Sequence, residues 1–152
     1  MRNLGISIYP EKSTDSELIN YINMAADAGF KRIFSCLLSA QGTKKDIVDR
    51  FSGIIDYANK KGLQTIVDVN PSVLRKLNVS GDDLSFFKDI KASGFRLDNG
   101  YSGYEEAMMT YNDYNLKIEI NMSNDTSYID TIMDNVPNKY NLVGCHNFYP
   151  HE

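Results

Sequence analysis

The segment Asp27-Ala28-Gly29-Phe30 precedes a short apolar run, and its pattern returns twice, as Lys60-Lys61-Gly62-Leu63 and as Ala92-Ser93-Gly94-Phe95. The three glycines, at positions 29, 62 and 94, are 33 and 32 residues apart. Glycine adopts the left-handed conformation that closes a helix without a Cβ clash, so each segment indicates the end of a helix and the start of a strand. A repeat of this length is typical of alternating strands and helices.

The composition is that of a folded domain and excludes a disordered or collagen-like chain. Of the 152 residues, 42% are hydrophobic, 24% are charged and only 10 are glycine. Lys and Arg number 16 against 20 Asp and Glu, which gives a net charge of −4. Since no basic run is long enough to follow a nucleic-acid backbone, we predict that nucleic acid is not a partner.

The chain carries no sign of a membrane segment or of a disulfide framework. No window approaches the roughly 18 apolar residues of a membrane span, and the N-terminus lacks the apolar region of a signal peptide. Cys36 and Cys145 lie in apolar strand-like runs, at a spacing that fits neither a disulfide nor a zinc site. We therefore predict a cytoplasmic protein with reduced thiols and no membrane partner.

Apolar runs separated by helix-like segments predict six strands. Thr14-x-x-Glu17 and Ser102-x-x-Glu105 have the spacing of a capping box, and Ser80 stands before a predicted first helical turn at Asp82. Strands that alternate with helices pair in parallel through right-handed crossovers. The predicted strands cover about residues 3–9, 32–38, 64–70, 95–98, 117–122 and 142–148.

Two helices show an apolar face at helical spacing, which predicts that they pack against a sheet. The two predicted faces consist of Leu18, Ile22, Ala25 and Ala26, and of Ile47, Phe51, Ile54, Ile55 and Ala58.

Polar side chains gather toward the C-terminal ends of the predicted strands. In three strands they share one parity (68 and 70, 96 and 98, 119 and 121), so they point to the same face. An open doubly wound sheet also binds ligands at strand ends, but helices cover both of its faces, and no Gly-x-Gly-x-x-Gly or Walker A sequence follows the first strand. We predict an α/β fold of the (β/α)₈ TIM-barrel type, of which this chain holds the first six strands.

Three carboxylates at these strand ends, Asp68, Asp98 and Glu119, are the predicted catalytic residues. Cleavage of a glycosidic bond needs one carboxyl group that holds a proton and another that is ionised. Crowding of like charges at a partly desolvated site produces that difference. The alternative for each residue alone is structural, namely a cap or an ion pair with a neighbour such as Arg96.

Eight further residues at the strand ends are predicted to bind substrate. Asparagine amides donate and accept hydrogen bonds and therefore suit sugar hydroxyls, although Asn70 before Pro71 also fits a turn. Arg96 suits a phosphate or carboxylate group, or else it neutralises Asp98 or Glu119. The predicted substrate-binding residues are Ser7, Tyr9, Ser35, Asn70, Arg96, Asn121, His146 and Asn147.

Two other functions remain open at this point. Asp68, Glu119 and His146 have the ligand chemistry of a divalent metal site in a barrel sugar isomerase or hydrolase, but no local motif such as His-Glu-x-x-His supports it. The second alternative is a sugar-binding module without catalytic activity. The leading prediction is a glycosidase that uses neither a metal nor another cofactor.

Six segments, in order along essentially the whole chain, resemble the signature segments of the bacterial 6-phospho-N-acetylmuramidases. The resemblance implies a cytosolic glycosidase that hydrolyses the bond between N-acetylmuramic acid 6-phosphate and N-acetylglucosamine during peptidoglycan recycling. Its small-molecule partner is that phosphorylated amino-sugar disaccharide. Asp68, Asp98 and Glu119 lie in the matching segments, which are Leu4–Pro10, Arg32–Leu38, Asp68–Pro71, Arg96–Gly100, Ile118–Ser123 and Gly144–Pro150.

The resemblance also implies a complete barrel followed by a smaller C-terminal β-rich domain. On this comparison residues 1–152 are the N-terminal part of the barrel domain, and the chain lacks strands seven and eight. We expect the chain by itself to have little activity and to self-associate through its open barrel edges.

Overall fold

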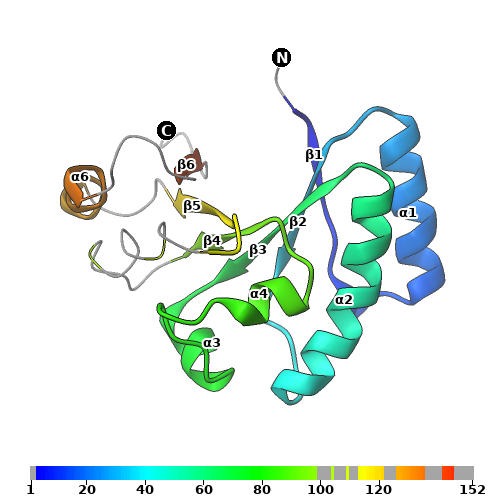
Figure 1. The fold of residues 1–152 in the computed structure, drawn as a ribbon. Coiled ribbons are helices and arrows are strands. Elements are labelled where there is room, and N and C mark those ends of the chain that lie inside the picture. The colour runs from blue at the N-terminus through cyan, green and yellow to red at the C-terminus, as the bar shows by residue number, and fades with distance from the viewer. Residues whose placement is uncertain are drawn as a thin grey trace, which may run out of the picture.

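The protein is an α/β structure built on one parallel sheet (Figure 1). The computed structural model describes residues 3–98, 104, 109, 113–121, 126–135 and 142–145. Within these residues the sheet has six strands in the order β1-β2-β3-β4-β5-β6, so every strand pairs with its neighbour in sequence. The strands are β1 (Gly5–Ser7), β2 (Arg32–Cys36), β3 (Gln64–Val69), β4 (Gly94–Leu97), β5 (Lys117–Asn121) and β6 (Leu142–Cys145).

The predicted order of strands and their parallel pairing are confirmed. The described sheet is open, with β1 and β6 at its two edges. It therefore supports the barrel-type order of strands, while closure into a (β/α)₈ barrel stays a prediction.

Helices follow the strands as the repeat predicts. Figure 1 shows α1 and α2 side by side near β1 and β2, with α6 at the opposite end of the sheet, near β5 and β6. No helix in the described part of the chain is long and apolar enough to cross a membrane. The helices are η1 (Pro10–Lys12), α1 (Asp15–Asp27), α2 (Lys44–Lys60), α3 (Pro71–Lys76), α4 (Ser85–Asp89) and α6 (Thr126–Asn135).

The helix starts follow capping chemistry in part. The predicted capping box at Thr14 is confirmed, because its hydroxyl accepts from the Glu17 amide at 3.3 Å. A second box at Thr43 begins α2 and was not predicted. The predicted start at Ser80 is wrong, since α4 begins at Ser85, whose amide donates to the Asp83 carboxylate at 3.0 Å. The predicted box at Ser102 lies outside the described residues.

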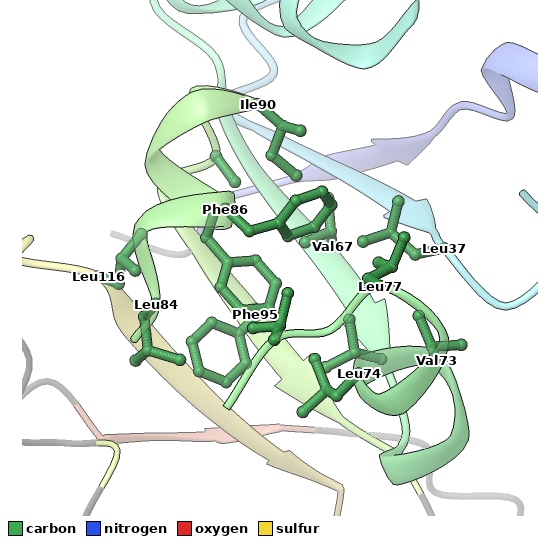
Figure 2. Close-up of a cluster of buried hydrophobic side chains, with 14 of the residues drawn as sticks. Leu37, Val67, Val73, Leu74, Leu77, Leu84, Phe86, Ile90, Phe95 and Leu116 are labelled. Atoms are coloured by element: carbon green, nitrogen blue, oxygen red, sulfur yellow. The ribbon is translucent and has the colours of Figure 1, made fainter. Parts of the chain in front are cut away.

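The larger hydrophobic core lies between the sheet and helices α2, α3 and α4. Side chains from alternate positions of β3 and β4 point into it, and they define what we call the helix-covered face (Figure 2). Phe95 stacks on Phe87 with ring centroids 4.2 Å apart, and both side chains are fully buried. Full burial of such a side chain contributes about 1.5–3 kcal/mol. The strand residues of this face include Val67, Val69, Phe95 and Leu97.

A second cluster joins α1 and α2 to the first two strands. The predicted apolar faces of both helices are confirmed, because Leu18, Ile22 and Ala25 of α1 and all five predicted residues of α2 are buried. Ile33 of β2 lies in the same cluster. The helices therefore occupy one side of β2, β3 and β4, and the alternate side chains of these strands are left for the other side.

The three repeated glycines serve two different purposes. Gly29 and Gly62 have φ of 84° and 81°, and both close a helix as predicted. Gly94 does not: it is the first residue of β4, and Lys91, with φ of 61°, takes the left-handed conformation instead. A Cβ on Gly94 would overlap the backbone carbonyl of Lys117 on β5. Gly94 is required because two strands approach each other there.

We predict that Gly94→Ala destabilises the protein more than Gly62→Ala. Alanine at 62 meets nothing within 4 Å and suffers only left-handed strain, about 1–2 kcal/mol. Alanine at 94 must displace β5, at a cost of about 3 kcal/mol. Urea unfolding of both variants measures the difference, and equal losses would contradict the role given to Gly94.

Candidate functional site

Charged side chains occupy the side of the sheet opposite the helix-covered face. Asp68 of β3 pairs in register with Arg96 of β4, and Arg96 pairs in register with Glu119 of β5. Arg32 and Phe34 of β2 have the parity of Cys36, which is in register with Asp68. We call this the charged face, defined by Arg32, Phe34, Asp68, Arg96 and Glu119.

Arg96 holds Asp68 in a buried ion pair. Its Nε donates to Oδ1 of Asp68 at 3.0 Å, and the two residues are 6% and 7% exposed. The guanidinium also lies over the Phe34 ring, with its central carbon 4.1 Å from the ring centroid. Arg96 is therefore held by a carboxylate and by an aromatic face. The ion pair with Asp68 adds a partner to those that the sequence suggested for Arg96, which were Asp98 and Glu119.

Glu119 forms a second ion pair, with Arg32. Arg32 stands on β2 and Glu119 on β5, three strand spacings apart, or about 14 Å along a flat sheet. Two side chains meet over that span only when the sheet curves toward the face that carries them. The contact therefore indicates that the charged face is concave, as the interior of a barrel is.

Burial raises the pKa of the Asp68 carboxyl above its ordinary value. The hydrogen bond and charge of Arg96 oppose that rise, and the neighbouring charge of Asp98 adds to it. Asp68 therefore holds its proton to a higher pH than an exposed aspartate does. A carboxyl with a raised pKa beside a second carboxyl is the arrangement that supplies a general acid and a base or nucleophile.

Asp98 follows β4 directly and lies one side-chain step beyond Arg96, toward the C-terminal ends of the strands. Its amide donates to the Val69 carbonyl at 2.8 Å, so the backbone continues the β3–β4 ladder. The residue is half-buried. Of the three predicted catalytic residues, Asp68 and Asp98 are brought together, while Glu119 is held by Arg32.

A cavity of about 550 Å³ opens on the charged face beside β1. Ser7 and Tyr9, both predicted to bind substrate, contribute hydroxyl groups to its wall. Such a wall combines hydrogen-bond donors with charge, as sugar and phosphate groups require. The side chains named above that line it are Ser7, Tyr9, Arg32, Phe34, Arg96 and Glu119.

The loop after β1 is tied to α2 by Arg50. Its guanidinium donates to the carbonyls of Pro10 and Ser13, each at 2.7 Å, and pairs with Asp15. In the same loop the Glu11 carboxylate accepts from the Ser39 hydroxyl at 2.5 Å. These contacts join the segments that follow β1 and β2 at the end of the sheet where Asp68 and Asp98 lie.

Two predicted substrate-binding residues have other surroundings. Ser35 lies on the helix-covered face in register with Val67; it is fully buried, and its hydroxyl has no hydrogen-bond partner in the described structure. Strand alternation turns it away from the charged face. Asn70 caps α3, because its side-chain oxygen accepts from the Val73 amide at 2.9 Å and from the Ser72 hydroxyl. The cap is the turn alternative that the sequence left open.

The remaining predicted residues are placed in part. Asn121 ends β5 in register with Cys145, and its side chain is not described. His146 and Asn147 lie outside the described residues. The described ranges contain no group of three His, Cys, Asp or Glu side chains that could hold a metal ion. The alternative set of Asp68, Glu119 and His146 includes a residue outside these ranges and stays a prediction.

Sequence reasoning missed Arg32, Phe34 and Cys36 as parts of the site. Cys36 is a free, half-buried thiol next to Asp68, and burial raises its pKa, with the Asp68 charge contributing to that rise. Positions 32, 34 and 36 share one parity within β2, and the sequence alone shows this alternation. It points to the charged face only when β2 is set in register with β3.

The structure defines a parallel α/β protein in which two carboxylates, Asp68 and Asp98, lie toward the C-terminal ends of adjacent strands. The chain matches the family described as "6-phospho-N-acetylmuramidase, N-terminal" over residues 4–152, and it belongs to that family. The family's description points to a glycoside hydrolase. No curated protein sequence matches the chain.

Several solved structures are similar to this chain in fold. An uncharacterized B. cereus protein is 47% identical, with a TM-score of 0.79 over 99% of this chain and 39% of that one. An Enterococcus faecalis protein of unknown function is 20% identical, with a TM-score of 0.75 over 99% and 40%. A Thermobaculum terrenum O-GlcNAc hydrolase, 12% identical with a TM-score of 0.61 over 94% and 40%, shares the fold. The chain thus spans about 40% of these structures.

We predict that Asp68→Asn changes the pH dependence of stability. Because the folded state keeps the Asp68 proton at a higher pH than the unfolded chain does, wild-type protein loses stability as pH rises above the ordinary aspartate pKa, about 3.9. The asparagine variant lacks that loss. Its free energy of unfolding relative to wild type should therefore increase between about pH 4 and pH 7.

Asp56→Asn provides the matched control. Hydrogen bonds from Lys60 and Lys91 lower the pKa of Asp56, so its stabilisation is present above the ordinary aspartate pKa and is lost as pH falls. The stability of this variant relative to wild type should decrease as pH rises, opposite to Asp68→Asn. Chemical denaturation across the pH range measures both, and a pH-independent difference for Asp68→Asn would contradict the raised pKa.

Proposed function

We propose that the protein to which this chain belongs is a glycoside hydrolase that cleaves the disaccharide of N-acetylmuramic acid 6-phosphate and N-acetylglucosamine. The observation that carries the proposal is the pair of Asp68, buried with a raised pKa, and Asp98, half-buried at the end of the adjacent strand. The family adds the substrate class. Two carboxyl groups with different protonation are what glycosidic cleavage requires.

In this mechanism Asp68 is the general acid. Its proton passes to the glycosidic oxygen as the bond from that oxygen to the anomeric carbon breaks, so the leaving sugar departs as a neutral alcohol. Burial favours the protonated form beforehand, and Arg96 stabilises the carboxylate that remains.

Asp98 is the base or nucleophile in this proposal. Its carboxylate stabilises the positive charge that develops at the anomeric carbon, either by attacking that carbon or by removing a proton from the attacking water. Glu119 has an electrostatic role: it balances the positive charge of Arg32, with which it is paired on the charged face. Ser7 and Tyr9 donate hydrogen bonds to the substrate from the cavity wall.

The remaining parts of the assignment follow from the family. We propose that residues 1–152 form the N-terminal part of a barrel whose later strands complete the site. The same proposal places the enzyme in the cytoplasm, in peptidoglycan recycling.

The test is hydrolysis of the phosphorylated disaccharide by the intact protein and its variants. Asp68→Asn and Asp98→Asn should each lower kcat by roughly 10²–10⁴-fold, since each removes an acid–base group. Glu119→Gln should lower it less, because Glu119 acts through Arg32. The matched control is Asp49→Asn, which changes an exposed carboxylate on α2 and should retain the wild-type rate.

The assay also separates the alternatives. Full activity in both Asp68→Asn and Asp98→Asn would contradict the proposed pair. Loss of wild-type turnover on adding a chelator would indicate the metal-dependent enzyme instead. Binding of the disaccharide without turnover by the wild-type protein would indicate a sugar-binding module.

A further inference from the structure

We propose that Phe34 is a positioning residue for the Asp68 carboxyl and acts through the guanidinium of Arg96. The proposal rests on the proposed function, in which Asp68 is the acid. Phe34 lies on the charged face of β2, one strand from Asp68 and two strands from Arg96. Its ring provides an aromatic surface against which the Arg96 guanidinium packs.

The register explains how the three side chains meet. Arg96 is level with Asp68 on the neighbouring strand, whereas Phe34 is level with Ile66, two residues earlier on β3. The Arg96 side chain must therefore extend sideways and back, across β3, to place its guanidinium over the Phe34 ring. In doing so it brings Nε to 3.0 Å from the Asp68 carboxylate.

The contact is a cation–π interaction in a partly desolvated place. The guanidinium carbon is 4.1 Å from the ring centroid, and Arg96 is only 6% exposed. The ring face holds the guanidinium on one side, and so limits the directions in which Nε can donate. A leucine at 34 would keep apolar volume but would remove this planar restraint.

The groups that face Asp68 determine the direction in which the Phe34 substitution moves the pKa of Asp68. Arg96 on β4 is the positive charge beside it, Asp98 after β4 is the negative one, and Cys36 on β2 lies level with it. Glu119, on the far side of Arg96, is paired with Arg32. When Arg96 is less well held, Asp68 loses part of the favourable hydrogen bond and charge that Arg96 supplies, and its proton is retained to higher pH.

The experiment compares Phe34→Leu with Phe34→Tyr and with Phe86→Leu in the intact protein. Phe34→Leu should lower kcat about three- to thirtyfold and shift the Asp68 limb of the pH–rate profile to higher pH. Phe34→Tyr keeps the aromatic ring, so kcat and the Asp68 limb should stay at their wild-type values. Phe86→Leu removes the same atoms from the core beneath the helix-covered face and should reduce stability without moving that limb.

A carboxyl-carbon NMR titration of Asp68 gives a readout that does not depend on turnover. It should show a higher midpoint in Phe34→Leu than in wild type or Phe34→Tyr. An unchanged midpoint in Phe34→Leu would overturn the proposal. If the wild-type protein does not hydrolyse the disaccharide and the midpoint still moves, the proposed function is wrong while the positioning role stands.

Arg96→Lys covers the case in which Phe34→Leu does not fold. Lysine keeps the positive charge but lacks the planar fork that stacks on the ring. The Asp68 midpoint should rise in this variant as well, and the added effect of Phe34→Leu should be small when it is combined with Arg96→Lys, because both changes act on one contact. Fully additive effects on the midpoint would overturn the proposal.

Discussion

Two arginine–carboxylate pairs hold four strands of the sheet together on one face. Arg96 with Asp68, and Arg32 with Glu119, place two arginines and two carboxyl groups on the same face of the sheet. Removing one partner of the buried Arg96–Asp68 pair costs about 3–5 kcal/mol, because the other charge is then left buried and unpaired. The Arg32–Glu119 contact also joins β2 to β5, which requires the sheet to curve around the charged face.

One face of the sheet packs in the hydrophobic core, and the other face carries the charged residues of the site. Phe95 and Val67 pack beneath the helices, where burial of apolar surface stabilises the fold, while Asp68 and Arg96 occupy the alternate positions of the same strands. The backbone that places an acid on the charged face is therefore held by the core on the helix-covered face. Asp68 is buried, and its neighbours shift its pKa. Asp98, at the strand end, lies closer to solvent.

The sequence predicts much of this because its signals are local. The glycines at 29 and 62, the capping box at Thr14 and the parity of 68 and 96 report on single helices, turns and strands, and all are confirmed. What it misses depends on contacts between strands. The pairing of Arg32 with Glu119, 87 residues away, follows from sheet curvature, and Gly94 is explained only by the approach of β5. Ser35 is polar like the site residues, but its parity within the strand places it on the other face of the sheet. The prediction that it binds substrate relied on its polar character alone.

The most direct test of the account is a crystal structure of the intact Asp68→Asn protein with the phosphorylated disaccharide bound. The proposed mechanism predicts that the side-chain amide at position 68 lies within about 3.2 Å of the glycosidic oxygen, with the Asp98 carboxylate near the anomeric carbon. A disaccharide bound away from the charged face, with neither residue near the scissile bond, would contradict it.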